Sequence, residues 1–216
     1  MLPTRFAAAL LLALPAVAAQ MPLPELRIEP TAGGSIFYIK NNSSEALSAY
    51  LIELVDYPGS SYSLWQDETV AEPIPPHGEK RIQVSNMTVG AVPDYVKMQA
   101  ALYASGTSAG VREKIAQLIE RRRVMIETIR QLIGRLEKAQ AEGTPKSEVV
   151  AALKQWADTL QPQGKGNRTT PAAVNQAAAR TLIASTAGGL DAHSLPEALT
   201  VLRTWDRLLT PNPPMR

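Results

Sequence analysis

The sequence contains no cysteine. Disulfide bonds, thiol nucleophiles, thiolate metal sites and cysteine-linked lipids are therefore all excluded. The fold must be stabilised by burial of apolar surface alone, and a chain of 216 residues is long enough for that.

Catalytic motifs are missing as well. The chain has no nucleophile elbow, no Ser-x-x-Lys or His-Glu-x-x-His motif, no EF-hand loop and no glycine loop of the kind that holds phosphate. Only two histidines are present, His77 in a Pro-His-Gly turn and His193 just before a predicted helix. The sequence thus predicts no cofactor, no metal site and no enzyme. The alternative is a secreted hydrolase of unknown type, with His77 or His193 as the base.

Long apolar runs are confined to the start of the chain. Residues 1–19 place Arg5 before an apolar stretch and end in small alanines. This order is typical of a secretory signal peptide, and an apolar stretch of about a dozen residues is too short to span a bilayer core of roughly 30 Å. We therefore expect cleavage after Ala18 or Ala19. The mature protein is expected to be exported, either periplasmic or secreted, without stable membrane insertion.

Residues 22–107 are acidic and carry strand patterns. Between positions 21 and 108 the chain has 5 basic and 10 acidic residues. Short runs rich in Ile, Val, Tyr and Phe alternate with turn residues, which predicts an antiparallel β-sandwich of immunoglobulin-like type. The expected strands are 26–29, 35–40, 46–57, 61–66, 80–85 and 96–104.

The hydrophobic period changes after Gly106. Apolar residues recur at alternating gaps of four and three, which predicts one long amphipathic helix over residues 108–142, closed by Gly143. Thr107 or Ser108 is expected to cap its start.

Arg122 is the one polar member of this apolar stripe. A buried charge without a partner is costly. We therefore expect Arg122 at a rim, or paired with an acidic residue of the sandwich so that the two halves are tied together.

Three shorter helices are predicted over residues 143–210, giving an α+β protein. Their start signals are Thr144-Pro145, Thr170-Pro171 and the capping-box pair Ser194 and Glu197. Their apolar stripes include Trp156 and Trp205, so they are expected to pack on the long helix in a small bundle, with both tryptophans in the core. Residues 211–216 are expected to be a disordered tail.

Three stretches carry a resemblance: IFYIKNNSSEALSAYLIEL, IPPHGEKRIQV, and ALYASGTSAG leading into an Arg-rich helix. They resemble a group of uncharacterised secreted bacterial proteins in which an N-terminal immunoglobulin-like β module precedes a long Arg-rich helix. The resemblance covers residues 30–138 and is carried by turn motifs. It implies the fold of the β module and secretion from bacteria, and it implies no activity and no site residues.

The densest basic cluster is a candidate interaction site. Arg121, Arg122 and Arg123 follow one another on the predicted helix. They form either a surface for phosphate or an anionic membrane, or a solvated face that pairs partly with the acidic sandwich. Consecutive helical residues point about 100° apart, which favours the second interpretation.

An aromatic group is the other candidate. Tyr57, Tyr62 and Trp65 lie on either side of a Pro-Gly turn, an arrangement typical of a recognition patch at the tip of a sandwich. The combined hypothesis is a non-catalytic extracytoplasmic binding or structural module. Its expected partner is a protein or another envelope component, and nucleic acid is not expected.

Overall fold

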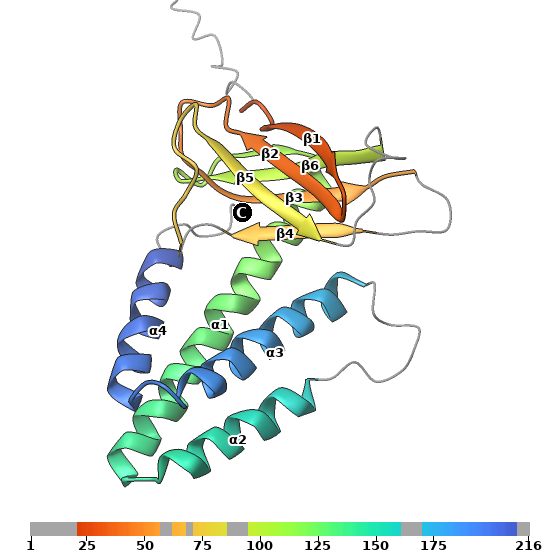
Figure 1. Ribbon diagram of the computed structural model, residues 1–216. Helices are drawn as coiled ribbons and strands as arrows, with labels where there is room; N and C mark the ends of the chain where they lie inside the picture. The colour runs from red at the N-terminus through yellow and green to blue at the C-terminus, as the bar shows by residue number, and fades with distance from the viewer. Residues whose placement is uncertain (1–20, 57–61, 68–70, 86–94, 161–169, 211–216) are drawn as a thin grey trace, which may run out of the picture.

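The computed structural model describes residues 21–56, 62–67, 71–85, 95–160 and 170–210 (Figure 1). The predicted signal peptide at 1–19, Tyr57 and the predicted tail at 211–216 lie outside these residues. The described chain is an α+β protein in which strands precede helices, as predicted. The strands are β1 (Glu25–Thr31), β2 (Gly34–Lys40), β3 (Leu47–Leu54), β4 (Ser63–Asp67), β5 (Glu79–Ser85), β6 (Val96–Tyr103) and β7 (Ser108–Gly110), and the helices are α1 (Arg112–Glu142), α2 (Lys146–Thr159), α3 (Pro171–Gly189) and α4 (Leu195–Leu209).

The strands form two antiparallel sheets. Sheet A has the order β1-β2-β5 and sheet B the order β4-β3-β6-β7. Because side chains alternate between the faces of a strand, each sheet sends every second residue into a common core. Phe37 and Ile39 of β2 meet Tyr50 and Ile52 of β3 and Tyr103 of β6 there. The two sheets therefore pack face to face.

The sequence pattern does not predict β7. Residues 108–110 pair with the end of β6, and Gly110 adopts a φ of 112°, which suits glycine. The long helix begins only after Val111, whose side chain makes no capping hydrogen bond. The prediction that Thr107 or Ser108 caps this helix is therefore wrong, because these residues build the β6–β7 hairpin instead.

β3 is buried on both faces. Tyr50 and Ile52 face sheet A, whereas Ala49 and Leu51 face the opposite side of sheet B. The first turns of α1 cover that outer side. The covering side chains are Ile115, Leu118 and Ile119.

α1 then continues past the sheets into the helical region (Figure 1). It has 31 residues and so is about 46 Å long. Its later residues Ile129, Leu132 and Leu136 are at most 1% exposed and lie in a second core with the other helices. The helix ends at Gly143, as predicted, where a φ of 66° lets the backbone N–H bond back to the last turn. One helix thus belongs to two cores.

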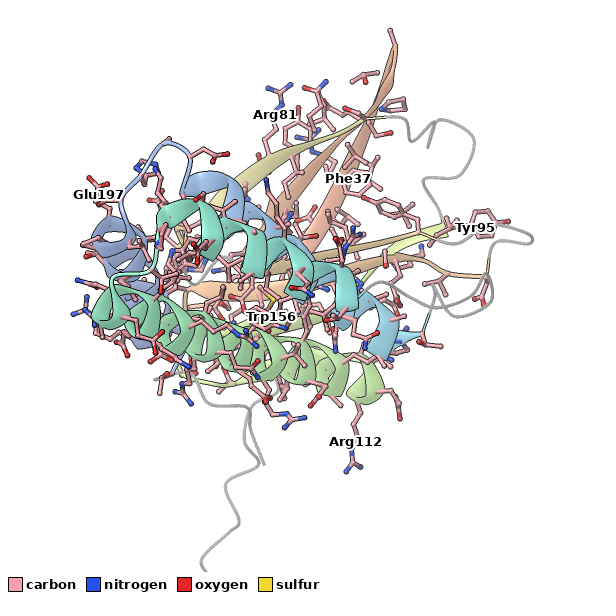
Figure 2. The ribbon with its side chains drawn as sticks, turned by 90° about the horizontal axis from the view of Figure 1, so that it is seen from below. Phe37, Arg81, Tyr95, Arg112, Trp156 and Glu197 are labelled. Carbon is pink, nitrogen blue, oxygen red and sulfur yellow. The ribbon has the colours of Figure 1, made fainter. Side chains whose placement is uncertain are left out.

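α3 and α4 pack on either side of α1, and α2 packs mainly on α3 (Figure 1). The predicted start signals at Thr170 and at the Ser194–Glu197 capping box are confirmed. Trp156 of α2 is turned toward α1, where the guanidinium carbon of Arg135 lies 4.4 Å from its ring centre (Figure 2). α3 and α4 each pack against α1 rather than against one another, and the space between them is the setting of the site described next.

Candidate ligand-binding site

The three arginines of the basic cluster lie in three different environments. Arg123 is exposed, and its Nη2 lies 2.7 Å from Oε1 of Glu120. Arg122 is buried and Arg121 is half-buried. Because successive side chains on a helix diverge by about 100°, the run does not form one basic surface.

Arg122 connects α1 to sheet B. Its side chain is buried, its Nε donates to Oδ2 of Asp67 at 2.7 Å, and its Nη2 donates to Oδ1 at 3.1 Å. Nη2 also lies 3.2 Å from the hydroxyl of Ser48. Two parallel bonds from one guanidinium to one carboxylate are a strong form of ion pair. The expectation that Arg122 pairs with an acidic residue of the β part is confirmed.

Arg121 lies beside this pair, and its hydrogen-bonding capacity is not fully used. Its guanidinium carbon is 5.4 Å from the centre of the Trp65 ring. Its Nη1 atom is buried and has no hydrogen-bond partner within the described part of the chain. Burial lowers the pKa of Arg121, and the Asp67 carboxylate opposes that shift. Since a guanidinium stays protonated in proteins, this position holds a partly desolvated positive charge.

A hollow opens beside Arg121, where α1, α3 and α4 meet the end of β4. Its volume is about 380 Å³, within the range of roughly 300–1,000 Å³ that small-molecule sites occupy. Among the described residues, Arg121 and Asp67 are its charged members. The remaining walls are almost entirely apolar, and we call the whole the junction groove. Its apolar members are Met125, Ile129, Ala178, Leu182, Trp205 and Leu209.

Trp205 separates the junction groove from a second hollow of about 340 Å³ between α3 and α4. The side chains with titratable or nucleophilic groups in this second hollow, the outer groove, include Ser185, Thr186, His193 and Glu197. Trp205 is half-buried and lines both grooves. Its indole is therefore partly exposed in a groove, although its place on the apolar stripe predicts a core position.

The aromatic residues predicted to form a patch do not come together. Tyr62 faces the core between the sheets, where its ring packs edge-on against Phe37 with centres 6.4 Å apart, and burial raises its pKa. Trp65 lies on the other face of β4, against the first turns of α1. Residues three apart on a strand point to opposite sides. Tyr57 lies outside the described residues.

Neither histidine is buried. His77 sits exposed in a turn with a φ of 59°. His193 is exposed before α4, and its Nδ1 lies 4.0 Å from Oε2 of Glu197. Glu197, which lies in the first turn of α4 (Figure 2), itself accepts hydrogen bonds from the backbone N–H and hydroxyl of Ser194, and the backbone bond is the main cause of its lowered pKa. Among the described residues, no group of three or more His, Asp or Glu side chains has a geometry that suits a metal ion.

Sequence reasoning missed two members of the junction groove. Asp67 ends β4 without any motif around it, and only the unusual charge at Arg122 hinted that an acidic partner existed. Trp205 was expected in the core, because periodicity identifies the apolar face of a helix and not how closely a neighbouring helix covers that face.

No known protein family, curated protein or solved structure matches this chain. In the part of the chain that the structure describes, no helix has the length and apolar character needed to cross a membrane.

Proposed function

We propose that this protein is an exported, non-catalytic binding module and that the junction groove is its ligand site. The observation that carries the proposal is Arg121, whose side chain lines an apolar groove and whose buried Nη1 has no hydrogen-bond partner in the described chain. A polar atom buried without a partner is costly, by about 1–3 kcal/mol and more for charged groups. A bound ligand that accepts this hydrogen bond offsets the cost.

A groove-filling variant with a neighbouring control tests the ligand site. Ala178 of α3 lines the junction groove, whereas Ala177 is exposed and does not. The mature chain should bind the anionic fluorophore anilinonaphthalene sulfonate saturably, with one site per chain. Ala178→Phe should weaken this binding at least tenfold and Ala177→Phe should change it less than twofold. Equal binding by the two variants would show that the probe binds elsewhere.

Export is the second part of the proposal. It rests on the signal-peptide pattern of residues 1–19. Mass spectrometry of secreted material should find Ala19 or Gln20 as the first residue. A peptide from residues 2–15 retained in the secreted protein would contradict export.

The β part is further proposed to be of immunoglobulin type. In that fold, strands A, B and E share one sheet and strands C, F and G the other. The order β1-β2-β5 corresponds to A-B-E, and β3-β6-β7 corresponds to C-F-G, with β4 added beside β3. An experimental structure in which β5 did not pair with β2 would refute this assignment, because strands B and E are neighbours in the immunoglobulin fold.

The alternative function is a hydrolase, and the outer groove supplies the observation that favours it. Ser185, His193 and Glu197 line this one hollow, which is the residue set of an acyl-transfer site. However, the Ser185 hydroxyl donates to the carbonyl of Leu182 at 2.9 Å, and Glu197 is engaged by Ser194. If this alternative holds, the protein should hydrolyse p-nitrophenyl esters, and Ser185→Ala should abolish the activity. Equal activity of His193→Ala and the parent would rule it out.

A further inference from the structure

We propose that the ligand of the junction groove is an aliphatic carboxylate, that is, a single carboxylate head on a flexible apolar chain. This inference rests on the proposed function, since it names the ligand class of the same groove. Two features carry it: the charge balance at the sheet end of the groove and the apolar character of the rest.

The charge balance leaves one positive charge for the ligand. Arg122 and Asp67 neutralise one another through two hydrogen bonds of 2.7 and 3.1 Å. Arg121 then adds a guanidinium whose Nη1 is buried and makes no hydrogen bond in the described chain. A monoanion would restore neutrality, and its carboxylate would pair with the Arg121 guanidinium, which lines the groove. A cation would be repelled, because Asp67, the one carboxylate among the described residues that line the groove, already pairs with Arg122.

The charge also favours a carboxylate over a phosphate. A phosphate dianion would exceed the single available positive charge and would approach the Asp67 carboxylate at the same end of the groove. A phosphate site normally offers several donors, such as backbone N–H groups at a helix start or a cluster of arginines. Among the described residues, the junction groove offers one guanidinium, that of Arg121.

The apolar walls of the junction groove determine which kind of group can carry the carboxylate. Beyond Arg121 the groove follows α1 through Met125 and Ile129, and Leu182 and Trp205 form its sides. These walls come from helices, whose backbone groups bond within the helix, so this part of the groove offers an extended peptide no main-chain hydrogen bonds. An alkyl chain needs no such partners. It gains affinity from burial alone.

Chain length and head charge give the first test. Binding of hexanoate, octanoate, decanoate and dodecanoate to the full mature chain is measured by calorimetry, below the concentration at which each forms micelles. Affinity should rise with length, by up to about fourfold for each added methylene. Dodecanoate should bind at least tenfold more tightly than dodecanol, and dodecyltrimethylammonium should not bind. An ammonium compound that bound as tightly as dodecanoate would overturn the inference.

A pair of arginine variants gives the second test. Arg121→Gln removes the free donor, whereas Arg123→Gln removes an exposed arginine two residues away that pairs with Glu120. Dodecanoate binding should fall at least tenfold in the first variant and less than twofold in the second. Arg121→Lys, which keeps the charge, should retain part of the affinity. Because the Arg121 guanidinium is partly desolvated, Arg121→Gln should melt at or above the temperature of the parent, so a loss of binding is not a loss of folding.

The remaining outcomes separate this inference from the proposed function. If dodecanoate does not bind but anilinonaphthalene sulfonate binds and Ala178→Phe removes it, the groove is a ligand site and the carboxylate assignment is wrong. If the chain binds phosphatidylglycerol vesicles but not dodecanoate, and Arg121→Gln abolishes the vesicle binding, the carboxylate assignment is also wrong. If neither the probe nor dodecanoate binds in the groove, both proposals fail.

Discussion

The Arg122–Asp67 pair should respond very differently to the loss of each partner. Asp67→Asn leaves the charge of Arg122 in place, on a side chain that is only 3% exposed. Arg122→Leu leaves the Asp67 carboxylate, which is 29% exposed and therefore hydrated. Leucine would also complete the apolar stripe of α1. Removing the acid should thus destabilise the protein far more than removing the base.

The magnitude follows from burial. Removing one partner of a buried ion pair costs about 3–5 kcal/mol. Asparagine still offers one acceptor to the guanidinium, so the free energy of unfolding should fall by about 3 kcal/mol in Asp67→Asn. In Arg122→Leu it should change by less than about 1 kcal/mol, since Ser48 keeps a hydrogen bond to the carbonyl of Leu102. The double variant should recover most of the loss.

Urea denaturation of a chain of residues 20–216 measures these values, with circular dichroism reporting the helices and fluorescence reporting the surroundings of Trp65, Trp156 and Trp205 together. Both signals should shift together. If Asp67→Asn costs no more than Arg122→Leu, the charge of Arg122 is not buried as described, and the connection between α1 and β4 has another origin.

Three further predictions concern the two cores and a helix cap. Ile129→Asp should unfold the helical region, because it places a charge at a position that is only 1% exposed. Gln131→Asp, on the exposed face of the same helix, should leave the region folded. Circular dichroism at 25 °C should therefore show a loss of helix in the first variant and none in the second. Burial, followed by the charge of Glu45, raises the pKa of Tyr103 to about 12, above the unfolded value of about 10. This group's stabilisation is therefore fully present below pH 10 and lost as the pH rises through 12, and Tyr103→Phe should remove the step near pH 12 from a phenolate absorbance titration. Ser194→Ala should lower stability by about 1 kcal/mol in thermal melts at pH 7. The lowered pKa of Glu197 in the same cap means that its contribution is present above about pH 4.3 and lost as the pH falls through the lower folded value.

Periodicity predicted the elements well where a residue's neighbours in sequence decide its conformation. The alternating gaps of four and three between apolar residues from Val111 onward predicted α1 to within a few residues. Gly143 correctly predicted where this helix ends. The three residues of β7 carry no such period, since Ala109 and Gly110 have little side chain to alternate. That strand exists because the end of β6 offers unpaired backbone groups, which is a tertiary cause.

The candidate site was only partly predictable for a similar reason. Arg122 stood out because its charge interrupts an apolar stripe, and this conflict correctly indicated an acidic partner. Arg121 has the same local sequence around it, and nothing in that sequence distinguishes the arginine that pairs from the one that does not. Arg122 pairs and Arg121 does not because of the positions that Asp67 and Trp65 take in the folded protein. The groove itself depends on the separation of α3 and α4, which no single helix encodes.

The dual burial of β3 has a consequence for how the protein is made. Sheet B emerges before α1, whether from the ribosome or from an export channel, so the apolar residues Leu51 and Leu102 stay uncovered on the outer face until residues 112–123 have also emerged. During that interval the nascent β part resembles an aggregation-prone intermediate rather than a finished domain. A chaperone or a short delay in release would protect it, and a truncation before α1 should yield insoluble protein even though every strand of both sheets is present.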